Sequence, residues 1–174
     1  LTSLIQTNAG SMNSAFAKTN ITSADLSSLV FVVGNYSCAA IFNRCNNLSN
    51  VDLSTVSSIS GSSAFKEAFI YCTSLSSLSF PSLCTVSGGS SIFNLMLNGC
   101  NGVTVHFPSN LQATIGNWSD VVNGFGGTNT TVLFDLVSSA PLTGANNTVY
   151  KRHAKFDTAT SLAWWANYNY TTHY

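Results

Sequence analysis

The chain repeats itself at an offset of 27 residues, and this repetition constrains its fold more than any other feature. The stretch CTSLSSLSFPSL, which begins at Cys72, is a near copy of CNNLSNVDLSTV, which begins at Cys45. Two apolar columns run through the chain at the same offset: Ala24, Val51, Leu78 and Val105, and Leu26, Leu53, Phe80 and Phe107. A fixed period of about 20 to 50 residues is typical of repeat architectures. We therefore expect a solenoid whose units bury their apolar sides against their neighbours.

Each repeat carries two different apolar periods. Apolar and polar residues alternate up to Leu53, which predicts a half-buried strand. Gly61 follows an apolar arc and suits a tight turn, because glycine tolerates positive φ. Phe65, Phe69 and Cys72 then lie at i, i+4 and i+7, which predicts a short helix with one apolar stripe. The same stripe recurs twice, at Cys38, Phe42, Cys45 and at Phe93, Leu97, Cys100.

Three segments carry a resemblance to a known family. The stretches CNNLSNVDL, CTSLSSLSFP and AFIYC resemble the BspA-like leucine-rich repeats, whose units have an AF..C..L..I.LP pattern. The match covers roughly residues 12 to 118, and it departs from the pattern at Lys18, which stands in the cysteine column. The family is found largely in bacterial surface proteins and in similar phage-borne or parasite proteins. The resemblance implies adhesion or scaffolding at a cell or virion surface, without enzymatic activity.

Together these patterns predict a β-rich α/β leucine-rich repeat solenoid with a separate C-terminal part. Residues 1–118 are expected to form about four stacked coils of 27 residues that share one parallel sheet. Residues 119–140 read as a C-terminal cap, whose strand would run from Thr130 to Leu136. Residues 141–174 read as a polar linker and an aromatic tail.

Composition excludes several classes of function. With 45% hydrophobic residues the chain can bury a substantial core, but only 7% of its residues are charged, and six basic residues balance six acidic ones. The basic surface that a nucleic-acid-binding protein needs is therefore missing. The strongly apolar run LVFVV near the N-terminus is too short to span a membrane, so we expect no membrane insertion.

The five cysteines are an odd number and form no CxxC pair, so the sequence indicates neither a zinc site nor a complete disulfide framework. Cys45, Cys72 and Cys100 should lie above one another on adjacent coils as buried thiols, with disulfides or a metal site as the less favoured alternatives. We expect no cofactor.

The outward-facing positions of the predicted strands are polar. Asp25, Asp52, Ser79 and His106 form one column, and a carboxylate, a hydroxyl and an imidazole in a row invite a hydrolase interpretation. An exposed strand face supplies no oxyanion hole, so a solvated or ligand-contacting row is preferred. The candidate binding face comprises Asn50, Asp52, Ser77, Ser79, Thr104 and His106, whose hydroxyl and amide groups could pair with sugar hydroxyls.

A second candidate surface lies in the tail. Trp164, Trp165, Tyr168 and Tyr170 could stack on sugars or anchor a subunit interface, or they could pack on the protein itself. The leading hypothesis is an extracellular, non-catalytic binding or adhesion module that recognises a protein or glycan on a host or bacterial surface. The alternative is a structural subunit of an extracellular assembly, such as a phage fibre or filament, with the repeats as spacer and the tail as contact.

Overall fold

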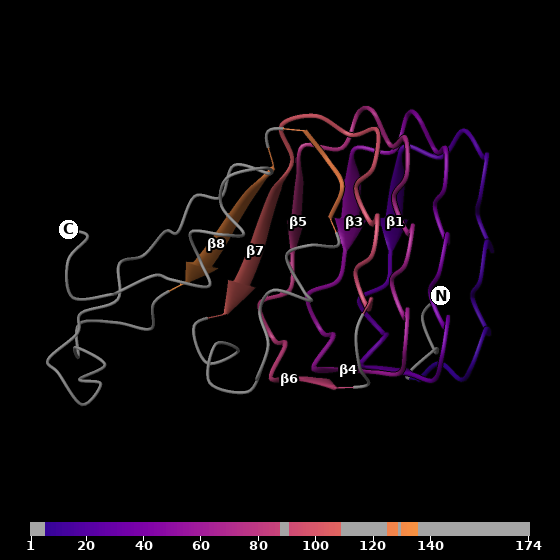
Figure 1. Ribbon diagram of the computed structural model, residues 1–174, viewed down its shortest axis with the longest axis vertical. Coiled ribbons are helices and arrows are strands. Elements are labelled where there is room, and N and C mark those ends of the chain that lie inside the picture. Colours follow the sequence, from indigo (N-terminus) through magenta and orange to yellow (C-terminus); the bar gives the residue numbers. More distant parts are fainter. Residues whose placement is uncertain (1–5, 88–90, 109–124, 129, 136–174) are drawn as a thin grey trace, which may run out of the picture.

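The computed structural model is a β-solenoid of about three turns, in which successive coils lie side by side and every strand pairs in parallel with a strand of a neighbouring coil (Figure 1). The structure describes residues 6–87, 91–108, 125–128 and 130–135. The strands are β1 (Ser23–Asp25), β2 (Phe31–Val33), β3 (Asn50–Asp52), β4 (Ser58–Ser60), β5 (Ser77–Ser79), β6 (Thr85–Ser87), β7 (Thr104–Pro108) and β8 (Thr131–Asp135).

The strands form two sides of each coil. On one side β1 pairs with β3, and β5 pairs with β7, which in turn pairs with β8. On the other side the order is β2, β4, β6. Paired residues are corresponding members of the repeat, such as Val32 with Ile59 and Leu78 with Val105. The prediction of a parallel-sheet solenoid is confirmed, but the single expected sheet is instead three separate parallel ladders, and the turns number about three instead of four.

The third side of the coil is built from successive turns. We call it the turn ribbon, and it comprises residues 10–18, 36–44, 63–71 and 91–99. Every fourth residue of the ribbon has a positive φ, as at Tyr36, Ala40 and Arg44 (55°, 50° and 61°). Most of these residues are not glycine, although the left-handed conformation costs other residues about 1–2 kcal/mol.

Backbone hydrogen bonds explain how the ribbon is held together. Within a coil, every second N–H group donates to the carbonyl three residues earlier, as Asn43 does to Ala40 (3.0 Å). The N–H groups in between donate to the next coil, as Phe42 does to Ala68 (2.8 Å). Half of the amides therefore hold the turns, and the other half hold the stack.

The prediction of short helices around residues 38–45, 65–72 and 93–100 is wrong, because no helix occurs in the described part of the chain. The apolar spacing that predicted them is real, and it places the same side chains inward. A four-residue turn brings positions i and i+4 to one side of the chain much as an α-helical turn does. The turn ribbon differs from an α-helix in its hydrogen bonds: its N–H groups donate alternately to the carbonyl three residues earlier and to a carbonyl of the next coil.

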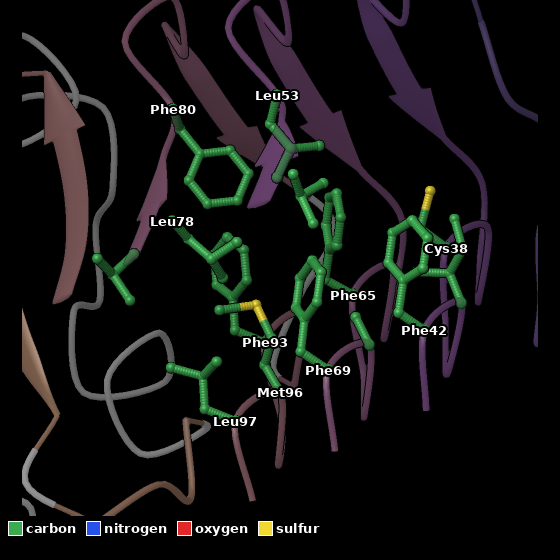
Figure 2. Packing of buried hydrophobic residues seen from close by; sticks show 14 of the residues in the cluster. Cys38, Phe42, Leu53, Phe65, Phe69, Leu78, Phe80, Phe93, Met96 and Leu97 are labelled. Carbon is green, nitrogen blue, oxygen red and sulfur yellow. The ribbon is translucent and has the colours of Figure 1, made fainter. Parts of the chain in front are cut away.

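The core fills the space between the three sides (Figure 2). Phe42 and Phe69 are fully buried and stack with ring centroids 5.6 Å apart, and Phe80 and Phe107 stack at 5.5 Å. The predicted inward column of Val51, Leu78 and Val105 is buried. Like side chains thus stack on like side chains from coil to coil.

The cysteine column is also confirmed as buried thiols. Cys45, Cys72 and Cys100 lie in the core, and none of the five cysteines forms a disulfide. Each of the three donates its thiol hydrogen to a carbonyl oxygen of the preceding coil, as Cys72 does to Phe42 (3.1 Å) and Cys100 to Phe69 (3.1 Å). Each of these carbonyls also accepts a backbone hydrogen bond within its own coil, so the thiol supplies a second one.

The predicted strand at residues 130–136 exists as β8, which pairs with β7 from Thr104 with Thr131 to Pro108 with Asp135. It continues the strand ladder by one further rung. The remainder of the expected cap and all of the linker and tail lie outside the described residues.

Candidate functional site

The sequence-predicted binding face lies on the strand side of the coil formed by β1, β3, β5 and β7. Ser77 pairs with Thr104, and Ser79 with His106. The residues between the six predicted ones are buried in the core. The six predicted residues themselves are exposed or half-buried: Asn50, Asp52, Ser77, Ser79, Thr104 and His106. The structure therefore brings these residues onto one surface as the alternation indicated.

The two aspartates of this side have a structural role. Oδ1 of Asp25 accepts a hydrogen bond from the N–H of Ser27 (2.9 Å), and Oδ1 of Asp52 accepts one from the N–H of Ser54 (2.9 Å). Hydrogen bonds from the Ser27 side chain and backbone lower the pKa of Asp25. Each carboxylate thus fixes the turn that ends its strand. This role weakens the interpretation of the row as a catalytic triad.

A shallow depression lies at the corner where the turn ribbon ends. It is lined by Arg44, Asn46, Tyr71 and Thr73. The Arg44 guanidinium carbon lies 5.3 Å from the centre of the Tyr71 ring, which is a cation–π arrangement. Below the ring, a Cβ placed on Gly99 would come within 2.3 Å of Tyr71. Tyr71 is therefore held between an arginine and a glycine, while 44% of its surface remains exposed.

The rim of the depression is fixed by backbone contacts. The Thr73 hydroxyl donates to the Asn46 carbonyl (3.3 Å), and the Thr73 N–H donates to the Tyr71 carbonyl (3.0 Å). The side chains of Asn46 and Thr73 are exposed. The depression thus combines a positioned aromatic ring, a guanidinium group, an amide and a hydroxyl.

Sequence reasoning missed this site, although a signal for it exists. Lys18, Arg44, Tyr71 and Gly99 occupy one column of the turn ribbon, each at positive φ (61°, 61°, 56° and 77°). An arginine, a tyrosine and a glycine in consecutive repeats place a cation over the ring from the preceding coil and a backbone without a side chain against the ring from the following coil. Aligning the outward columns in the same way as the inward ones would have shown this arrangement.

The buried thiols are poor candidates for chemistry. Burial raises the pKa of Cys38 to about 12, that of Cys72 to about 12 and that of Cys100 to about 11. Thiolates are the nucleophilic and metal-binding form of cysteine, and these groups stay protonated at neutral pH. Within the ranges that the structure describes, no three histidine, cysteine or acidic side chains gather into a possible metal site. The predicted tail site at Trp164, Trp165, Tyr168 and Tyr170 lies outside those ranges.

Comparison with known proteins identifies no relative. No protein-family model matches the chain, and neither a curated protein nor a solved structure is significantly similar to it. A search of the described residues found no helix with the length and apolarity needed to cross a bilayer. The function must therefore be inferred from the geometry above.

Proposed function

We propose that this protein is a non-catalytic binding module that recognises a glycan, with the Tyr71 depression as the centre of its site. The observation that carries the proposal is an exposed aromatic ring whose position is fixed by Arg44 above and Gly99 below. An aromatic side chain whose orientation is already fixed loses little conformational entropy when a ligand packs against its exposed part.

The surroundings suit a sugar better than a charged or strongly apolar ligand. Asn46 and Thr73 offer an amide and a hydroxyl beside the ring. The neighbouring strand side continues this chemistry with Asn50, Ser77 and Thr104. Such donors and acceptors pair with sugar hydroxyls, while the exposed part of the tyrosine ring would contact the C–H groups of the sugar.

The proposal includes the family and the setting that the sequence suggested. We place the chain among BspA-like leucine-rich repeat proteins with a 27-residue unit, displayed extracellularly on a bacterial cell or virion. The repeat columns of phenylalanine and cysteine support this placement, because each has a defined place in the stack. A protein ligand on the host or bacterial surface is the alternative target.

A second candidate function is a structural subunit of an extracellular assembly, such as a phage fibre or filament. The parallel ladders favour it, because β5, β7 and β8 continue in register along the stack and would make a stiff spacer. In this case the tail around Trp164 and Trp165 would supply the subunit contact.

Glycan-array screening of the full chain, followed by calorimetric titration of the best glycan, tests the leading proposal. Tyr71→Ala should weaken binding by about tenfold or more, because it removes the exposed aromatic surface that the ligand would contact. Tyr36→Ala is the matched control: Tyr36 is also exposed, at 47%, and also has positive φ, 55°, but it does not line the depression. Equal losses in the two variants, or no binding to any glycan, would contradict the proposal.

A further inference from the structure

Two cations lie on neighbouring coils at the corner of the Tyr71 depression. Lys18 and Arg44 occupy the same column of the turn ribbon, and the N–H group of Lys18 donates to the carbonyl of Asn43 (2.7 Å), which holds their coils in register. Both residues are exposed, and each has a φ of 61°. Positive charges on adjacent coils repel each other, so the pair favours an anionic group bound beside it.

The carboxylate side chains that the structure describes are engaged elsewhere. Oδ1 of Asp25 and Oδ1 of Asp52 accept hydrogen bonds in the turns that end β1 and β3. Glu67 pairs with Lys66 (3.6 Å), and this is the only ion pair within the described ranges. Among these carboxylates, none neutralises the two cations at the depression.

The Arg44 guanidinium has the geometry that recognises a carboxylate. Its N–H groups form a planar fork, which can donate two parallel hydrogen bonds to the two oxygens of one carboxylate. The guanidinium carbon lies 5.3 Å from the centre of the Tyr71 ring, so the group is already placed at the depression before a ligand arrives. A group positioned in advance loses less conformational entropy on binding.

We propose that the glycan recognised at the Tyr71 depression carries a carboxylate, as uronic acids and sialic acids do, and that Arg44 binds this group. The inference rests on the proposed function and adds a substrate class to it. Asn46 and Thr73 line the same depression and contact the sugar hydroxyls. The ligand is therefore a sugar with an anionic group, and Lys18 adds a second positive charge that attracts it.

A glycan array that contains uronic acids, sialic acids, sulfated glycans and neutral glycans is the first test. The glycans that bind should carry a carboxylate, and the two acid classes show which source the site prefers. The best glycan is then titrated by calorimetry beside its reduced form, in which the carboxyl group has been converted to an alcohol. Reduction should weaken binding to the unaltered protein by about tenfold or more.

A variant of Arg44 separates recognition of the charge from positioning of the ring. Arg44→Gln should weaken binding of the carboxylated glycan by about tenfold more than it weakens binding of the reduced glycan. Lys66→Gln is the matched control, because it also removes one positive charge from the turn ribbon, but Lys66 does not line the depression. Far-UV circular dichroism and thermal melting establish that both variants are folded.

The outcomes separate this inference from the proposed function. Neutral or sulfated glycans that bind as tightly as carboxylated ones, and lose affinity in Tyr71→Ala, overturn the inference and leave the proposed function intact. Equal losses for the two glycans in Arg44→Gln mean that Arg44 acts only by holding Tyr71, which also overturns the inference alone. Absence of binding to every glycan overturns both. The comparison of the two glycans on the unaltered protein does not depend on how any variant folds.

Discussion

At the scale of single residues, burial converts the cysteines from reactive groups into packing and hydrogen-bonding groups. Cys45, Cys72 and Cys100 are buried, and each donates its thiol hydrogen to a carbonyl of the preceding coil. The thiol is small enough for the column and donates one weak hydrogen bond. The consequence is a stack whose stability depends on keeping Cys72 and Cys100 neutral, because burial raises the pKa of both thiols.

This dependence predicts a loss of stability in alkali. In the unfolded chain the thiols lose their protons near their ordinary pKa of 9.0, whereas in the folded chain Cys72 keeps its proton up to about 12. The folded state therefore binds more protons than the unfolded state between these values, and the free energy of unfolding falls as pH rises through them. Urea denaturation at several pH values from neutral to about 11 should show this fall.

Two variants separate the buried thiols from other groups that titrate in alkali. Cys72→Ala should reduce the steepness of the fall, because it removes one of the raised pKa values. Cys84→Ala is the control, because Cys84 is exposed and the variant removes a cysteine without removing a buried thiol. The explanation is wrong if the two variants have the same effect.

At the scale of elements, the turn ribbon is unusual because most of its positive φ positions are held by residues other than glycine. Every fourth residue has a strained, positive φ, and this conformation lets the backbone form hydrogen bonds both within a coil and between coils. Glu67 has a φ of 58°, whereas its neighbour Lys66 does not have positive φ, and the two side chains form an ion pair with N–O distance 3.6 Å. Substitutions at these two neighbouring positions can therefore be compared to measure the free-energy cost of the left-handed conformation.

Glu67→Gly should leave the protein more stable than Lys66→Gly by about 1–2 kcal/mol. Both variants lose the same ion pair, and both increase the flexibility of the unfolded chain. Only Glu67→Gly relieves a strained φ. Thermal or urea unfolding of the two variants measures the difference, and a more stable Lys66→Gly would refute the role given to the positive φ positions.

At the scale of the whole molecule, the closeness of successive coils is set where they approach backbone to backbone. Gly61 has a φ of 114°, and a Cβ placed there would lie 2.4 Å from the carbonyl carbon and oxygen of Gly34. Gly34 is in turn packed against the backbone of Ala9. This glycine column fixes the spacing of the stack on one corner.

Gly61→Ala should therefore destabilise the protein by more than Gly102→Ala, by about 2 kcal/mol or more. Gly102 also has positive φ, 72°, but a Cβ there meets no atom within 4 Å, so its substitution reports the conformational cost alone. Urea unfolding of both variants gives the comparison. Similar losses would mean that coil spacing is not limited at this corner.

The sequence by itself determined which side chains face the core and that the chain winds as a parallel stack. Columns such as Val51, Leu78 and Val105 are apolar at a fixed offset, and only stacking of equivalent positions buries them together. The polar strand face followed from the same alternation. Tertiary structure decided the rest, because spacings such as Phe65 to Phe69 fit a helix and a four-residue turn equally well. The neighbouring coils favour the turn over the helix, because their carbonyls accept hydrogen bonds from every second N–H group of the ribbon. The Tyr71 site depended on the same stacking, which brings together Arg44, Tyr71 and Gly99 from three different coils.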